Sequence, residues 1–159
     1  MVTLGAFQAR AVLGAGGISA CKQEGDGATP AGLLPLRRVL YRADRLPRPR
    51  AAVPVSPLAP HDGWCDDPAD AAYNRPVKLP FSAGHEELWR ADAVYDVIGV
   101  LGWNDAPPVR GPGVPPGSAI FLHLARLDRA PTAGCIALDC ADLLALLAAG
   151  MTEIEVEAT

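Results

Sequence analysis

The residues best suited to chemistry are a histidine and a cysteine twelve positions apart. His123 lies at the end of a predicted strand, residues 118–123, and Cys135 follows a Thr-Ala-Gly turn just before a predicted helix. A protonated thiol is a weak nucleophile, and a neighbouring imidazole lowers its pKa and stabilises the thiolate. Gly134 permits a close backbone approach, so its N–H and that of Cys135 could stabilise an oxyanion. One short turn could therefore supply both a nucleophile and an oxyanion hole.

The same two residues also fit a purely structural interpretation. Free cysteine is among the residue types most often buried, so Cys135 could pack as a small apolar side chain. His123 could simply end its strand. Neither the spacing nor the hydrophobic periodicity decides between catalysis and packing.

Other candidate sites are weaker. His61 and Cys65 stand beside two aspartates, but structural zinc normally needs four nitrogen or sulfur ligands, and the second half of a ligand set is missing. We therefore expect no metal and no cofactor. Residues 25–27 (Gly-Asp-Gly) lack the rest of a phosphate-binding loop, which excludes nucleotide binding. Cys140 has no histidine nearby in the sequence and is expected to pack structurally.

The composition predicts a single globular domain over residues 1–159. The chain has a mass of 16.6 kDa and 50% hydrophobic residues, enough for one core. Its net charge of −4 argues against a nucleic-acid partner. The four cysteines are too few and too irregularly spaced for a disulfide scaffold. We expect a monomer.

The sequence offers no membrane span and no visible export signal. The longest apolar stretch, residues 143–149, is far shorter than the roughly 20 residues that cross a bilayer. The first twenty residues lack a basic region, and Arg10 interrupts their apolar part. A signal peptide is therefore expected to be absent or already removed.

Short apolar runs separated by glycine and proline predict a mainly β protein with one or two short helices. The leucine-rich residues 143–147 predict a helix, because Asp139 and Asp142 imitate a capping box and Gly150 suits its C-terminal end. A helical turn is expected over residues 86–90. The expected strands cover residues 2–7, 11–13, 18–21, 39–43, 93–101, 118–123 and 152–158. Loops are expected at 22–32, 61–80 and 104–116, and residues 45–60 should be irregular or at a sheet edge.

Four segments together resemble the L,D-transpeptidase catalytic domain family, often called YkuD-like, in a short Gram-negative-type variant. They read KQEGDGATPAG, GWCDDPADAAYNRPVKLP, GSAIFLH and PTAGCIALDCADLLALL, and they span nearly the whole chain. The resemblance implies a YkuD-like β-sandwich in which Cys135 is the nucleophile and His123 its base.

The resemblance also implies a reaction on peptidoglycan stem peptides. In this family the thiolate attacks the carbonyl of the third stem residue, expels the terminal D-amino acid and leaves a thioester. An amine then forms a cross-link, whereas water would make the enzyme an L,D-carboxypeptidase. A wall-binding module without catalysis is a further alternative. The family implies a location in the periplasm or cell envelope, although a cytoplasmic location is not excluded.

The sequence departs from the family pattern near the nucleophile. Many members read Ser-His-Gly-Cys-Ile-Arg, whereas this chain has Ala133 and Ala137 in place of the histidine and the arginine. Leu124 replaces the usual glycine after the base. An arginine can orient a carboxylate through two hydrogen bonds, and we hypothesise that Arg75 supplies the missing cation. The expected substrate-binding residues are Arg75, Thr132, Trp64 and Tyr73.

Overall fold

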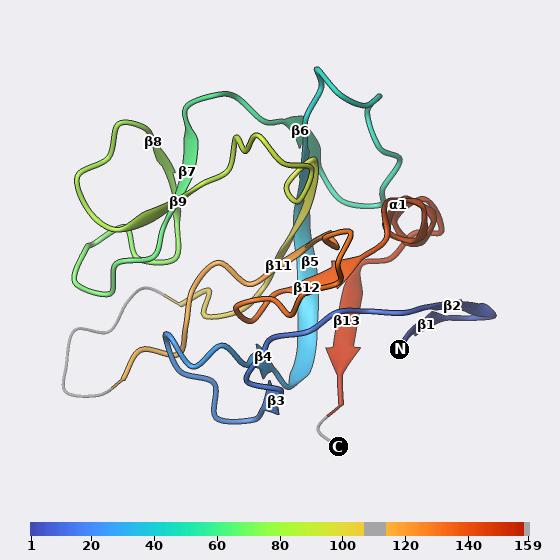
Figure 1. The fold of residues 1–159 in the computed structure, drawn as a ribbon, viewed down its shortest axis with the longest axis horizontal. Coiled ribbons are helices and arrows are strands. Elements are labelled where there is room, and N and C mark those ends of the chain that lie inside the picture. Colours follow the sequence, from blue (N-terminus) through green and yellow to red (C-terminus); the bar gives the residue numbers. More distant parts are fainter. Residues whose placement is uncertain (107–113, 158–159) are drawn as a thin grey trace.

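A computed structural model describes residues 1–106 and 114–157, and β-strands dominate it (Figure 1). The strands are β1 (Val2–Leu4), β2 (Phe7–Ala9), β3 (Ile18–Ser19), β4 (Thr29–Pro30), β5 (Gly32–Tyr41), β6 (Val55–Pro57), β7 (Asp62–Cys65), β8 (Pro76–Lys78), β9 (His85–Glu87), β10 (Val97–Leu101), β11 (Phe121–Leu124), β12 (Ile136–Leu138) and β13 (Glu153–Val156). The one helix among these residues is α1 (Cys140–Ala148). The predicted mainly β class is confirmed. Part of the expected loop at 104–116 and the end of the last expected strand lie outside the described residues.

The largest sheet has the strand order β12, β11, β10, β5, β13. Strand β5 pairs along one edge with β10. Its other edge is shared, because β13 pairs with residues 32–35 and β6 with residues 39–41. The predicted strand at 93–101 is confirmed in part as β10, which is central and buried at all five residues. The proline-rich segment contributes only the short β6, as its lack of backbone donors predicts.

Strands β11 and β12 run parallel at one end of this sheet. β11 contains His123, and β12 begins directly after Cys135. Their register places Leu122 opposite Ile136 and His123 opposite Ala137. The N-terminal segment covers the outer side of β12, where Val12 and Ala137 exchange two backbone hydrogen bonds of 2.8 Å. The expected strand at 11–13 thus forms only an isolated bridge, which a second bridge between Gly14 and Thr132 follows.

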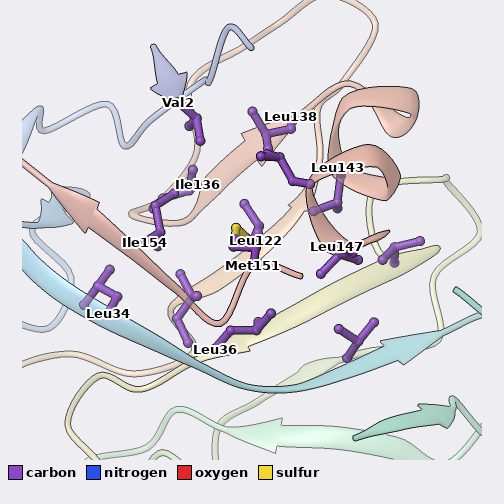
Figure 2. Close-up of a cluster of buried hydrophobic side chains, with 14 of the residues drawn as sticks. Val2, Leu34, Leu36, Leu122, Ile136, Leu138, Leu143, Leu147, Met151 and Ile154 are labelled. Carbon is purple, nitrogen blue, oxygen red and sulfur yellow. The ribbon is translucent and has the colours of Figure 1, made fainter. Parts of the chain in front are cut away.

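Side chains alternate across the main sheet and form two buried clusters. On one face, Leu122 and Ile136 pack with Leu147 and other apolar residues of α1 (Figure 2). On the other face, Phe121 belongs to a second cluster with Trp64, which comes from the three-stranded sheet β8–β7–β9. In Figure 1 this small sheet and α1 lie on opposite sides of β5. The layers are consistent with the expected β-sandwich-like fold.

The predicted helix is confirmed, but its capping differs from the prediction. Asp139 is the N-cap residue, yet its side chain makes no cap hydrogen bond and instead accepts one from Arg129 at 2.8 Å. The capping-box interpretation is therefore wrong, because an ion pair takes the carboxylate. Gly150 adopts a φ of +91°, as a glycine beyond a helix end often does. Within the described ranges, no helix combines the length and apolarity needed to cross a membrane.

Three expected loops or turns are wrong because tertiary pairing makes strands of sequences with weak local signals. Residues 61–80 contain β7 and β8, and Trp64 and Cys65 of β7 are buried rather than on a surface loop. The expected helical turn at 86–90 begins as β9, which pairs with β7. The expected loop at 22–32 contains β4, which pairs with β3. The partners of β9 and β4 lie outside their own segments, whereas β7 and β8 pair with each other within residues 61–80.

Candidate active site

The bend that carries Cys135 is fixed by two threonine hydroxyls. Thr132 Oγ1 donates to the Cys135 carbonyl at 2.7 Å and accepts from the Gly134 N–H at 3.2 Å. Thr29 Oγ1 accepts from the Gly14 N–H at 2.9 Å and lies 3.5 Å from the same Cys135 carbonyl. Thr132 thus shapes the turn as expected. It also occupies the Gly134 N–H, which leaves the Cys135 N–H as the backbone donor of this bend for an oxyanion.

Glycine is required at position 134. Its φ of +136° lies in a region that other residues rarely adopt, and an added Cβ would lie 2.8 Å from the Ala28 carbonyl oxygen. The segment before β4 therefore packs directly against the bend. This contact explains why two segments more than a hundred residues apart in the sequence together set the position of the thiol.

The Cys135 thiol is nearly buried, with 8% of the residue exposed. Its Sγ donates to the Ala119 carbonyl at 3.2 Å and accepts the Phe121 N–H at 3.4 Å. Burial raises the pKa of this thiol to about 12, and the negative charge of Glu86 acts in the same direction. The expectation that the imidazole lowers this pKa is wrong for the protein without substrate, because desolvation dominates.

His123 is held as a neutral imidazole. Its Nδ1 lies 2.9 Å from the Leu124 carbonyl, which can only accept, so Nδ1 carries a proton and Nε2 of the neutral ring has a free lone pair. Burial lowers the pKa of His123, and the charges of Arg90 and Arg126 lower it further. The ring also packs edge-to-face with Tyr95, at 5.4 Å between centroids. This environment fixes the ring and keeps it uncharged near neutral pH.

Cys135 and His123 open onto one cavity of about 1260 Å³, which we call the thiol cavity. The pairing of His123 with Ala137 puts both side chains on the same face of the main sheet, since Cys135 precedes Ala137 by two residues. Among the described residues the two side chains form no hydrogen bond with each other, and the thiol donates to the Ala119 carbonyl instead. To give its proton to Nε2, the thiol must turn away from that carbonyl.

Sequence reasoning missed the charged residues of the thiol cavity. Arg90 and Asp92 form a two-point ion pair, with distances of 2.8 and 2.6 Å. Glu86 accepts a 2.6 Å hydrogen bond from the Tyr95 hydroxyl. Arg126 lies on the exposed rim. Only the pairing of β9 with β7 brings Glu86 to the cavity, so no local motif could have identified it.

Arg75 does not supply the missing cation. Its guanidinium donates to the carbonyls of Asn74, Asp105 and Ala106, at 2.8, 2.8 and 3.1 Å. It therefore fastens one loop to another and is not among the residues that line the thiol cavity. The cavity takes its positive charge from Arg90 and Arg126, so the hypothesis placed the cation on the wrong segment.

Trp64 and Tyr73 also lie away from the lining of the thiol cavity, in a buried network behind it. The Trp64 indole N–H donates to Asn74 Oδ1 at 3.0 Å, and the same oxygen accepts the Ala119 N–H at 3.0 Å. The Tyr73 hydroxyl donates to Glu24. Because Ala119 also accepts the thiol hydrogen bond, Trp64 is connected to the site through Asn74 and the backbone of Ala119, and not by lining the cavity.

The remaining polar candidates show no metal-binding arrangement. In the described part of the chain, no three His, Cys, Asp or Glu side chains are grouped so that they could hold an ion. Cys65 is buried, and its Sγ donates a long hydrogen bond to the Asp67 carbonyl at 4.0 Å. Cys140 is exposed at the start of α1, so its expected packing role is wrong.

Comparison with known proteins agrees with this geometry. The family profile described as YkuD, the L,D-transpeptidase catalytic domain, matches residues 3–155. Searches of curated proteins and of solved structures find no match. The match runs from within β1 to within β13, and it includes the bend, both threonines and every charged residue of the thiol cavity. The chain therefore belongs to the YkuD family of L,D-transpeptidase catalytic domains, which act in cell-wall metabolism.

Proposed function

We propose that this protein is a cysteine acyltransferase that forms a thioester on Cys135 with the stem peptides of peptidoglycan. The observation that carries the proposal is the thiol cavity, in which the sulfur of Cys135 and the imidazole of His123 share one opening. The family match supplies the substrate class. We further propose that the domain works in the cell envelope, where that substrate is found.

Acylation begins when the substrate carbonyl displaces the thiol from its contact with Ala119. The thiol proton passes to Nε2 of His123, and the sulfur attacks the carbonyl carbon of the third stem residue. The Cys135 N–H stabilises the resulting oxyanion. As the C–N bond breaks, the imidazolium returns the proton to the departing D-amino acid, and the thioester remains.

Arg126 is the best candidate to bind the carboxylate of the departing residue. It is exposed at the rim of the thiol cavity, whereas Arg90 is already paired with Asp92. A guanidinium can hold a carboxylate through two parallel hydrogen bonds. Arg126 would thus take the place that the family gives to an arginine two residues after the cysteine, where this chain has the buried Ala137.

The proposal is tested by covalent labelling with a carbapenem, a β-lactam that acylates a reactive thiol. We expect one adduct by intact-mass measurement, and peptide mapping should place it on Cys135. The exposed Cys21 and Cys140 are internal controls, since they are more accessible but do not line the thiol cavity. Labelling only at those two positions would contradict the proposal, and no labelling with intact binding of wall peptides would indicate a binding module.

Replacing Gly134 with alanine should damage both stability and acylation. The positive φ costs about 1–3 kcal/mol, and the contact with Ala28 must also open. A shift of the bend of about 1 Å can lower the rate of acylation roughly a hundredfold. Urea unfolding and release of the terminal D-amino acid from a stem tetrapeptide measure the two effects.

Gly150→Ala is the matched control for that variant. Gly150 also has a positive φ, but an added Cβ there meets no atom within 4 Å. It should lose stability through the backbone alone and keep its rate of acylation. Equal losses of acylation in the two variants would show that the contact between Gly134 and Ala28 does not position the thiol.

A further inference from the structure

We propose that Glu86 binds the ammonium group of the acyl acceptor in the thiol cavity and accepts its proton, so that the thioester is resolved by an amine in preference to water. This inference rests on the proposed function, because it concerns the second half of the same reaction. It names the residue that would favour the amine over water, which the catalytic pair alone leaves open.

The first line of evidence is the place of Glu86 relative to the catalytic pair. β9 pairs with β7 so that Glu86 lies opposite Trp64, and the half-buried Glu86 lines the thiol cavity together with Cys135 and His123. Its Oε2 accepts the Tyr95 hydroxyl at 2.6 Å, and the Tyr95 ring packs on His123. One side chain thus connects the carboxylate to the base.

The second line of evidence is the charge balance of the cavity wall. The guanidinium of Arg90 is the nearby positive charge, but it already forms an ion pair with Asp92 through two hydrogen bonds. Within residues 1–106 and 114–157, Glu86 forms no ion pair, and its hydrogen-bond partner is the neutral Tyr95. A partly desolvated carboxylate without a counter-ion attracts a cation more strongly than an exposed one does. An ammonium group would supply the missing positive charge.

The third line of evidence is the basicity of the group. Burial raises the pKa of the Glu86 carboxyl, and the charges of Asp66 and Glu24 add to this increase. A carboxylate with a raised pKa accepts a proton from an ammonium at a smaller cost in free energy. Glu86 can therefore both concentrate the cationic acceptor and convert it to the free amine that attacks.

The acceptor ammonium gives one proton to Glu86, and the free amine attacks the thioester carbonyl carbon. The new C–N bond forms, His123 removes the second proton from the nitrogen, and the C–S bond breaks to release the Cys135 thiolate. The His123 imidazolium then protonates that sulfur, and Glu86 loses its proton to solvent. Water carries no charge and gains less from the carboxylate, so the amine is favoured.

The test is the partition of the thioester between amine and water in Glu86→Gln. A stem tetrapeptide serves as donor and a second stem peptide with a free side-chain amine as acceptor, and the products are separated by liquid chromatography and mass spectrometry. We expect the ratio of cross-linked to hydrolysed product to fall about tenfold or more, which corresponds to about 1.4 kcal/mol. Release of the terminal D-amino acid is measured in the same samples, so that a change in the rate of acylation is separated from a change in the partition of the thioester.

Two further variants make the result specific. Glu155→Gln removes the same charge from an exposed position on β13, outside the thiol cavity, and should leave the ratio unchanged. Tyr95→Phe keeps the ring but removes the hydroxyl that orients Glu86, and should lower the ratio by less than Glu86→Gln does. If Glu86→Gln does not fold, the ratio of cross-linked to hydrolysed product in Tyr95→Phe decides the test.

An unchanged ratio in a folded Glu86→Gln protein would overturn the inference, and so would an unchanged ratio in Tyr95→Phe if Glu86→Gln does not fold. A wild-type protein that never releases the terminal D-amino acid would instead contradict the proposed function. Glu86→Gln should also raise the rate of Cys135 alkylation at a fixed pH, because the Glu86 charge raises the pKa of that thiol. A merely structural role for Glu86 would not increase thiol reactivity while decreasing capture by amines.

Discussion

A Cys135→Ala protein is expected to release no measurable terminal D-amino acid from a stem tetrapeptide, a loss of at least about a thousandfold in rate. The reason is that the proposed thioester needs this sulfur, and the other buried thiol, Cys65, lies in β7 outside the lining of the thiol cavity. The fold should persist, because alanine removes one sulfur atom and two weak hydrogen bonds. Release of the D-amino acid is measured by a coupled oxidase assay, and folding by circular dichroism.

Cys140→Ala is the matched control, since it removes an exposed thiol only five residues away. It should retain the wild-type rate. Residual turnover in Cys135→Ala above about one part in a thousand would contradict a thioester on this residue. The rate would then have to come from water or from another group in the cavity.

His123→Asn is expected to lower the rate of acylation by about a hundredfold to ten-thousandfold, because the thiol loses its proton acceptor. Asparagine preserves a donor toward the Leu124 carbonyl, so the backbone contact of Nδ1 can be kept while Nε2 is lost. The loss should appear in kcat more than in KM. A variant with an unchanged rate would show that another group or water takes the thiol proton.

The pKa shifts of His123 and Cys135 set how the rate depends on pH. The pKa of His123 lies below its usual value of 6.5, so the neutral ring persists to lower pH than in an ordinary histidine, and the acid limb of kcat/KM should fall below pH 6.5. Because burial raises the Cys135 pKa to about 12, alkylation of the free enzyme should rise about tenfold per pH unit above neutrality. A plateau near neutral pH would instead indicate a preformed ion pair of thiolate and imidazolium.

The elements that the sequence predicts well are those with a strong local pattern. The apolar run that becomes β10, the leucine-rich α1 and the alternating β13 each bury the residues that their pattern selects. The short strands β7 and β9 carry glycine, histidine and glutamate, and they exist because each finds a partner. Their pairing is a tertiary property that no window of the sequence contains.

The residues of the candidate site also differ in whether a local motif could identify them. Cys135, Gly134 and Thr132 lie within four residues, so a motif could identify the bend. The cation could not be predicted, because the position of Arg126 near the opening depends on how β11 ends and how its chain turns. Arg75 was an equally plausible choice by residue type, and only its carbonyl partners show that it serves a loop. The raised pKa of the thiol likewise follows from burial, which spacing does not report.

The bridge between Val12 and Ala137 covers part of an edge of the main sheet. Without it, β12 would end the sheet with unsatisfied N–H and C=O groups, the kind of open template on which another chain can add a strand. Because the N-terminal segment takes up those groups at Ala137, the strand that follows Cys135 offers less open edge to another chain.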